Sequence, residues 1–266
     1  MTEAIVRVLN KDLLELPEGW EERAQAARDA GPSEVNNNAS LWQECKPCLK
    51  KISYDKCFYC EVKQIRSDNA VDHFRPKKHY PWSAFDPLNF RFACTYCNSR
   101  RKDIENGRTG GKGDYFPLLI EENRATCCEE ECNEAPVLLD PYKSDEPSLI
   151  DFTDDGRPIP TFTSDQHANR HRRAVESIRL YHLDHQDLVD KRLTLAAEIT
   201  SIVETTNRLF PKTEAGDPDV DSAFKENVRL LGKMMLPNAE LSSFARRMLD
   251  GYRHYVWVPG ILRTLS

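Results

Sequence analysis

Three strings in the first half of the chain decide its fold: Cys57-Phe58-Tyr59-Cys60, Val71-Asp72-His73-Phe74-Arg75-Pro76-Lys77, and Cys94-Thr95-Tyr96-Cys97-Asn98-Ser99-Arg100-Arg101-Lys102. The first and last strings each begin with a C-x-x-C pair, and 33 residues separate the two pairs. A two-residue spacer lets both thiolates of a pair reach one ion, and two pairs complete a closed tetrahedral site. The sequence therefore predicts a structural zinc ion whose binding energy holds an irregular segment together. The ligands of this ion would be Cys57, Cys60, Cys94 and Cys97. The alternative is that these four residues are buried free thiols.

The chain has nine cysteines, which is many for 266 residues. Its first residues carry mixed charge and lack the basic start and apolar stretch of a secretory signal, so we expect a cytoplasmic protein. In that reducing compartment clustered cysteines serve as metal ligands more often than as disulfides. Cys45 and Cys48 lie in a predicted helix, where they can share an ion or pack as small apolar residues. A second zinc site at Cys127, Cys128 and Cys132 remains an open alternative.

The charge distribution is uneven. The chain has a formal net charge of −6, yet residues 56–112 hold 12 Lys and Arg against 6 Asp and Glu, which leaves −12 for the remainder. A basic island in an acidic chain is the footprint expected for phosphate contact, the alternative being chance clustering. Acidic flanks would repel a long duplex, so we expect the isolated chain to bind nucleic acid weakly. No apolar run is long enough to span a membrane.

The sequence pattern divides the chain into four segments. Helical periodicity and breakers at Pro17 and Gly31-Pro32 predict a helical segment over residues 1–55. An irregular, cysteine-punctuated core follows over residues 56–114, and residues 115–163 read as loops with a few short strands. Apolar residues at helical spacing return over residues 164–266. The predicted fold class is therefore α+β, with a zinc-braced core embedded in a mainly helical protein.

Asp72 and His73 lie side by side between the two cysteine pairs. Phosphodiester hydrolysis needs a base whose pKa lies near neutrality, and a hard cation that takes up charge on the phosphate. His73 suits the base and Asp72 suits the cation. An isolated Asp-His dipeptide is more often a surface or packing feature, so the assignment depends on the residues around it.

Those residues resemble the HNH endonuclease family. C-x-x-C is followed by Asp72-His73, then by Asn89, and then by a second C-x-x-C with Asn98 directly after it. The resemblance implies a ββα-metal core, two antiparallel strands and a helix around a divalent ion. It assigns Asp72 and Asn98 as metal ligands, His73 as general base, and Asn89 as the residue that braces the loop between the strands. Asn98 occupies the third position of the signature, where the residue that gives the family its final H is a histidine. An amide oxygen in place of an imidazole favours magnesium or manganese over a softer ion.

The resemblance also assigns five cations to the substrate phosphates: Arg75, Lys77, Arg100, Arg101 and Lys102. Strings around Val71–Asp103, Val137–Pro141 and Ile178–Arg192 are similar, more narrowly, to the PtuB family, the nuclease subunits of Septu antiphage systems and related retron-associated operons. That similarity implies an ATPase partner of the PtuA type, with residues 164–266 as the candidate docking region. DNA is expected as the substrate more than RNA. The alternatives are a free-standing HNH nuclease of a restriction or mobile element, and a non-catalytic zinc module that binds nucleic acid or protein.

Two other sequence features are not interpreted as binding sites. The string Gly107-Arg108-Thr109-Gly110-Gly111-Lys112-Gly113 does not match a nucleotide-binding P-loop, and we expect a loop near the substrate instead. His182 and His185 lie three residues apart on a predicted helix and could bind a metal. Without partner ligands nearby, they are interpreted as solvated or capping histidines.

Overall fold

The computed structural model describes residues 10–63, 69–102 and 107–264. Helices dominate, and the sheets that these residues form are small, antiparallel and two-stranded, which confirms the predicted α+β class. No helix in the described part of the chain is long and apolar enough to cross a membrane. The helices are α1 (Trp20–Asp29), α2 (Ser40–Glu44), α3 (Lys46–Ile52), α4 (Thr95–Asn98), α5 (Ser164–Leu180), α6 (Gln186–Thr213), α7 (Pro218–Met234), α8 (Ser242–Asp250) and α9 (Val258–Thr264). The strand pairs are β1 (Ala70–His73) with β2 (Phe90–Ala93), β3 (Arg101–Lys102) with β4 (Thr109–Gly110), and β5 (Ile150–Phe152) with β6 (Pro158–Pro160).

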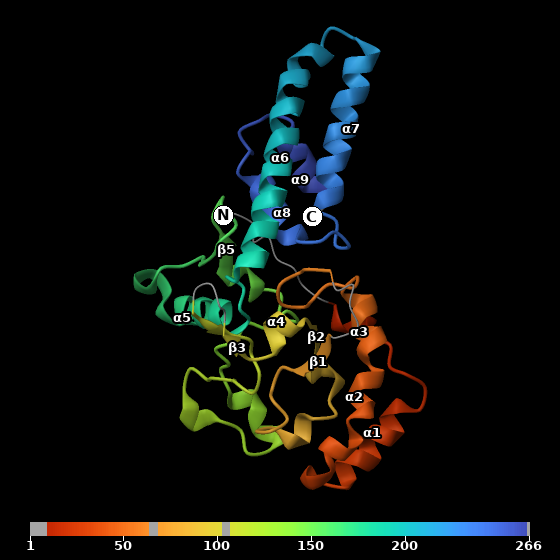
Figure 1. The fold of residues 1–266 in the computed structure, drawn as a ribbon, viewed down its shortest axis with the longest axis vertical. Coiled ribbons are helices and arrows are strands. Elements are labelled where there is room, and N and C mark those ends of the chain that lie inside the picture. The colour runs from red at the N-terminus through yellow and green to blue at the C-terminus, as the bar shows by residue number, and fades with distance from the viewer. Residues whose placement is uncertain (1–9, 64–68, 103–106, 265–266) are drawn as a thin grey trace.

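The β1–β2 hairpin and α4 follow one another along the chain and lie near the middle of the lower part of the molecule (Figure 1). Successive side chains of a strand point to opposite faces, and side chains on both faces of β2 are buried. Phe90 and Phe92 pack into an apolar cluster with α1, α2 and α3, whose Trp20 is fully buried. Ala93 belongs to a second, larger cluster that contains the cysteines of the two C-x-x-C pairs, which are called the knuckles below. The hairpin therefore separates an N-terminal core from a core shared with the C-terminal helices.

Helices α6 and α7 pack against each other as an arm that projects from the rest of the molecule (Figure 1). Asp217 begins α7 as an N-cap whose carboxylate accepts from the Asp219 N–H, and Pro218 occupies the first turn, where no N–H is needed. His185 caps α6 in the same way, with its Nδ1 atom accepting from the Leu188 N–H. The capping interpretation of His185 is therefore confirmed.

A buried ion pair fixes the irregular stretch between the core and the helical tail. Arg91 lies on β2 and donates two hydrogen bonds of 2.8 Å from Nη2 to the carboxylate of Asp140. Both side chains are buried, and the guanidinium also lies over the Tyr142 ring, 4.0 Å from its centroid. A buried charge is tolerated only when it is paired and hydrogen-bonded, so this pair specifies where residues 137–142 must lie.

The glycine-rich string closes onto the end of α4. Gly111 has a φ of 85°, and a Cβ atom at this position would lie 2.0 Å from the Ser99 carbonyl oxygen. The next two residues donate backbone hydrogen bonds to the last carbonyls of α4, from Lys112 to Cys97 at 2.8 Å and from Gly113 to Asn98 at 2.7 Å. Only glycine can bring the chain this close to Ser99.

We predict that Gly111→Ala destabilises the protein by more than about 2 kcal/mol, because alanine combines a strained positive φ with a clash against backbone. The measurement is urea unfolding followed by circular dichroism. Gly232→Ala in α7 is the matched control, since its Cβ would meet nothing within 4 Å and should be neutral or slightly stabilising. Equal stability of Gly111→Ala and wild type would contradict the proposed packing.

Candidate metal and catalytic site

Four buried cysteines from the two C-x-x-C pairs converge on one point. The Sγ atoms of Cys57, Cys60, Cys94 and Cys97 all lie within 4.8 Å of one another, and those of Cys60 and Cys94 are 3.9 Å apart. Four thiolates at about 2.3 Å from a zinc ion would be spaced by slightly less than 4 Å, so this cluster fits a tetrahedral zinc ion. The cluster offers four ligands and leaves no open position, which suits a structural ion.

Backbone N–H groups around the knuckles donate hydrogen bonds to the cysteine sulfurs, which stabilises the thiolate form. The Cys94 N–H donates to the Cys57 sulfur at 3.4 Å, and the Cys97 N–H donates to the Cys94 sulfur at 3.5 Å. The first knuckle is joined to β2 because the Phe58 N–H donates to the Phe92 carbonyl. Hydrogen bonds to the charged form of a ligand favour that form, so the local fold prepares the sulfurs for a cation.

The remaining five cysteines do not join such a cluster within the described residues. Cys45 is buried in the N-terminal core, its thiol directed at the Leu41 carbonyl, and burial raises the pKa of this thiol to about 12. Cys128 and Cys132 are exposed, and the Cys132 thiol contacts the Glu129 carbonyl. The geometry therefore favours the packing alternative for Cys45 and gives no support to a second zinc site.

Asp72 is buried on β1 and both of its carboxylate oxygens accept hydrogen bonds. Oδ2 accepts from the Tyr59 hydroxyl at 2.6 Å, and Oδ1 accepts from the Lys112 ammonium at 2.9 Å. Lys112 is fully buried and also donates to the His73 carbonyl at 2.6 Å. Lys112 had no predicted role. Its sequence signal is weak, a lysine between two glycines, and only the fold brings it to Asp72.

His73 is also buried, but it faces the other core. Its Nε2 atom lies 3.0 Å from the Ala84 carbonyl oxygen, and its ring meets those of Trp42 and Phe90 edge-on at 5.1 and 5.3 Å. Burial lowers the pKa of His73 to about 4, so the ring is uncharged near neutral pH. Adjacent strand residues point to opposite faces, and the contacts of Asp72 and His73 differ accordingly. The structure does not direct these two side chains into one cluster.

Asn89 joins the two ends of the loop between β1 and β2. Its Oδ1 atom accepts from the Arg75 N–H at 2.7 Å, while its Nδ2 atom donates to the carbonyls of Arg75 and Ser83 at 2.9 and 3.0 Å. Ser83 precedes Ala84, whose carbonyl contacts the His73 ring. Asn89 therefore holds together the two ends of the loop that contacts the His73 ring.

Asn98 ends α4, which packs against β1. Its side chain is half-buried and makes no hydrogen bond to any residue in the described ranges. No hydrogen bond joins Asn98 to Asp72, but the Asn98 carbonyl is held by Gly113, the residue after Lys112.

The five cations expected at the phosphates lie in different environments. Arg75 is half-buried and forms ion pairs with Glu134 and Glu131, with Nε–Oε2 distances of 2.9 and 3.4 Å. Lys77 lies over the Trp42 ring. Arg100 is exposed over the Tyr115 ring and Arg101 lies over the Tyr96 ring, each 4.4 Å from the centroid. Lys102 is exposed on β3. Arg75 is tied to the segment after the core, whereas Arg100 and Lys102 face solvent.

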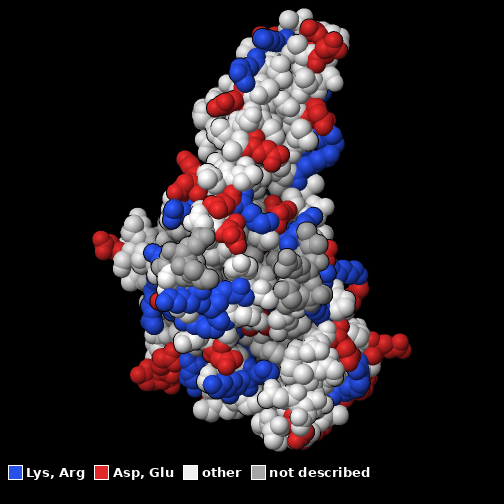
Figure 2. Space-filling model, in the orientation of Figure 1, with Lys and Arg blue, Asp and Glu red and all other residues white. Residues whose placement is uncertain are grey.

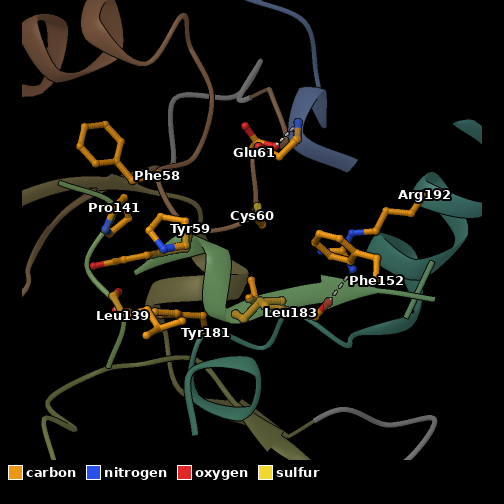
Figure 3. Close-up of a pocket in the computed structure, with 13 residues that line it drawn as sticks. Phe58, Tyr59, Cys60, Glu61, Leu139, Pro141, Phe152, Tyr181, Leu183 and Arg192 are labelled. Carbon is orange, nitrogen blue, oxygen red and sulfur yellow. Dashed lines mark hydrogen bonds between the residues drawn. The ribbon is translucent and has the colours of Figure 1, made fainter. Parts of the chain in front are cut away.

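The helical tail contacts this site through a stack of two tyrosines. Tyr59, which holds Asp72, stacks on Tyr181 at the end of α5 with ring centroids 3.9 Å apart. Both rings line a small cavity of about 90 Å³ beside Cys60, and Arg192 enters it from α6 with its guanidinium over the Phe152 ring (Figure 3). The position of Asp72 therefore depends on residues from the tail.

Comparison with known proteins gives one informative similarity. No family model matches the chain. The chain is 30% identical over 171 residues to Septu protein PtuB of Bacillus mycoides (strain KBAB4), an alignment that covers 59% of this chain and 52% of that protein. The chain thus spans about half the length of this curated relative. The similarity supports a PtuB-like relationship, in agreement with the strings noted in the sequence.

We predict that the purified protein carries one zinc ion per chain, and that Cys57→Ser or Cys94→Ser loses both the ion and the folded state. The physical reason is that metal binding supplies the folding energy of a closed cysteine site. Elemental analysis and circular dichroism are the measurements. Cys128→Ser, an exposed cysteine outside the cluster, should keep zinc and fold normally. A wild-type chain that is folded and free of zinc would contradict the prediction.

We predict that Lys112→Met destabilises the protein by about 3 to 5 kcal/mol, because it leaves the Asp72 carboxylate buried without its counter-ion. Chemical unfolding measures the loss, and Lys102→Met at an exposed position should change stability by less than about 0.5 kcal/mol. Adding Asp72→Asn to Lys112→Met should recover part of the loss, because the two side chains interact directly. Strictly additive effects of the two substitutions would contradict the pairing.

Proposed function

We propose that the chain is a metal-dependent HNH-type endonuclease that hydrolyses phosphodiester bonds of nucleic acid. One observation supports the proposal: β1, β2 and α4 follow one another beside the four-cysteine cluster, and Asp72, His73 and Asn98 lie on these elements with Asn89 directly before β2. The loop brace at Asn89 supports the same assignment, because the role it has in the structure is the one the resemblance implies.

In this proposal His73 is the general base and accepts a proton from the attacking water on its uncharged ring. Asn89 keeps the loop, and so the ring, in place. Asp72 and Asn98 would hold a magnesium or manganese ion through hard oxygen donors. When bound, such an ion supplies charge stabilisation at the phosphate and the leaving oxygen. The carboxylate and amide fit this group in chemistry, since each Asp72 oxygen keeps a second lone pair beside the hydrogen bond it accepts.

We further propose that the nuclease acts in antiphage defence together with an ATPase subunit of the PtuA type. The similarity to Septu protein PtuB supports this assignment. The region 164–266 is the proposed docking region, and its α6–α7 arm projects from the molecule where a partner can reach it (Figure 1). The free-standing nuclease of a restriction or mobile element is the alternative enzyme, and it would cut without a partner.

A non-catalytic zinc module is the second candidate function, and one observation favours it. The Lys112 ammonium already balances the charge of Asp72, and the Tyr59 hydroxyl occupies the other oxygen. Asp72 would then serve only to hold these two side chains. The two candidates differ in whether the chain hydrolyses a phosphodiester with magnesium or manganese present.

We predict that wild-type protein, purified with its operon-encoded ATPase, cleaves plasmid DNA in magnesium or manganese, and that His73→Ala abolishes cleavage. Removing the base raises the barrier of the chemical step without touching the zinc cluster. Leu49→Ala, on α3 in the same N-terminal apolar cluster, is the control for the loss of buried side-chain volume. Zinc content and thermal unfolding verify that both variants fold.

Asn98→Ala should instead raise the manganese concentration needed for half-maximal cleavage, because it removes a ligand of the ion. Cleavage by His73→Ala at the wild-type rate would refute the catalytic assignment. Failure of the wild-type chain to cut DNA or RNA with either ion, with and without the ATPase, would favour the non-catalytic zinc module. Rapid cleavage without any partner would favour the free-standing nuclease.

A further inference from the structure

Two surface hollows meet at Arg100, two residues beyond Asn98. The first has a volume of about 710 Å³ and is lined by residues that include Lys78, His79, Arg100 and Arg124. The second has a volume of about 880 Å³, and its cationic lining residues are Arg100, Arg108, Arg157 and Arg179. Figure 2 shows Lys and Arg side chains gathered on this face below the arm, over β3 and α5. We call the second hollow the arginine groove.

We propose that the arginine groove binds the phosphate backbone of the nucleic acid and leads it to the Asn98 end of α4. The inference rests on the proposed function, because it gives the substrate of the nuclease a path across the molecule. Arg100 is shared by both hollows and immediately follows the candidate site, so a strand in the groove continues toward that site.

The fold assembles the groove from three segments that are far apart in sequence. Arg100 and Arg108 directly precede β3 and β4, Arg157 directly precedes β6, and Arg179 lies in the last turn of α5. Helix α5 packs against both β4 and β6. The approach to β4 is close, because a Cβ atom at Gly110 would lie 2.1 Å from Cγ of His182. This packing brings arginines that are far apart in the sequence onto one surface.

This arrangement changes the electrostatic expectation from the sequence. The flanks of the basic island total −12 and were expected to repel a duplex. Arg157 and Arg179 belong to those flanks, yet the fold places them beside the island residues Arg100 and Arg108. Asp184 is the acidic residue among those that line the groove. The local charge therefore has the opposite sign to the flanks as a whole.

The groove arginines are accessible to phosphate. All four are exposed, and three have carboxylate partners at the surface: Arg108 with Asp184, Arg157 with Asp155, and Arg179 with Glu176. Exposed ion pairs of this kind contribute about 0 to 1 kcal/mol each, so a phosphate can displace the carboxylates. Arginine also suits phosphate because its planar guanidinium donates two parallel hydrogen bonds.

The lining between the arginines is apolar. Ile159 and Val175 line the groove and are 38% and 40% exposed. Sugar rings offer apolar surface between consecutive phosphates, so they can lie over these two side chains while the arginines contact the backbone. The chemistry recognised is that of phosphate and sugar, with no base-specific donor pattern, and binding should depend little on sequence.

The test compares two double variants of the full chain, each built in the His73→Ala background so that the probe stays intact. Arg157→Gln with Arg179→Gln removes two charges from the groove. Arg208→Gln with Arg229→Gln removes two charges from exposed positions on the arm and is the matched control. Binding of a fluorescein-labelled 30-base-pair DNA duplex is followed by anisotropy between 50 and 200 mM KCl.

The groove variant is expected to bind at least tenfold more weakly at 100 mM KCl. The slope of log affinity against log salt should fall by about 1.8, since each phosphate contact contributes about 0.9. The arm variant should keep the wild-type slope. Arg157→Lys with Arg179→Lys should restore the slope, because counterion release depends on charge. Unchanged thermal unfolding of each variant excludes a folding defect.

Equal losses in the groove and arm variants would overturn the groove, because net charge alone would then explain binding. Wild-type DNA binding by the groove variant, with loss of the ATPase partner instead, would identify the surface as a protein interface and also overturn it. These outcomes are independent of the nuclease assignment. If Arg157→Gln with Arg179→Gln, placed in a chain that keeps His73, leaves DNA cleavage at the wild-type rate, the nuclease assignment stands and the groove is overturned. If DNA binding depends on the groove but the chain with His73 cuts no nucleic acid, the groove stands and the nuclease assignment fails.

Discussion

The arrangement of the site depends on one constraint, the convergence of four cysteine sulfurs from the two chain segments that precede and follow the β1–β2 hairpin. Cys57 and Cys60 precede the hairpin, and Cys94 and Cys97 follow it directly. A single ion held by all four would close a loop of more than thirty residues and fix α4 against β1. The loop contains little regular structure of its own, so packing alone would leave it poorly defined. The position of Lys112 at Asp72 follows from that of α4, because Lys112 and Gly113 donate backbone hydrogen bonds to the Cys97 and Asn98 carbonyls.

Buried charges then specify how the other segments attach to this unit. Arg91 pairs with Asp140 and Lys112 with Asp72, and each pair joins segments that are far apart in the sequence. Lys56 and Glu61 pair within one short segment, and both also hydrogen-bond to the first residues of α8. Burying a charge is costly unless a partner is present, so each pair penalises arrangements that separate its members. Apolar contacts between the same segments would tolerate small shifts. The ion pairs therefore give the irregular segments a defined position that their apolar content could not provide alone.

The sequence predicted those features that depend on local spacing. The cysteine pairs, the long tail helices and the α+β class could be read from residues that lie close together in the chain. Lys112 could not, because its contact with Asp72 spans 40 residues and depends on a glycine whose backbone passes close to Ser99. The opposite directions of Asp72 and His73 follow from their adjacency on β1, because successive side chains of a strand point to opposite faces, and the sequence-based assignment of the pair did not use this alternation. The arginine groove was missed because the net charge of a segment says nothing about which of its side chains share a surface.

The shared core also decides how the tail can be studied. The cluster that contains the four cysteines includes Leu188 and Ile199 of α6 and Phe244 of α8. Tyr181 supports the ring of Tyr59, and the Ser243 N–H donates to the Glu61 carboxylate at 3.0 Å. Removing residues 164–266 would expose this core and release the knuckle as well as any partner surface. A truncation therefore cannot separate docking from zinc binding, even though the sequence pattern changes near residue 164. Substitutions on the exposed sides of α6 and α7 leave the core intact, so they are the way to ask whether a partner binds the arm.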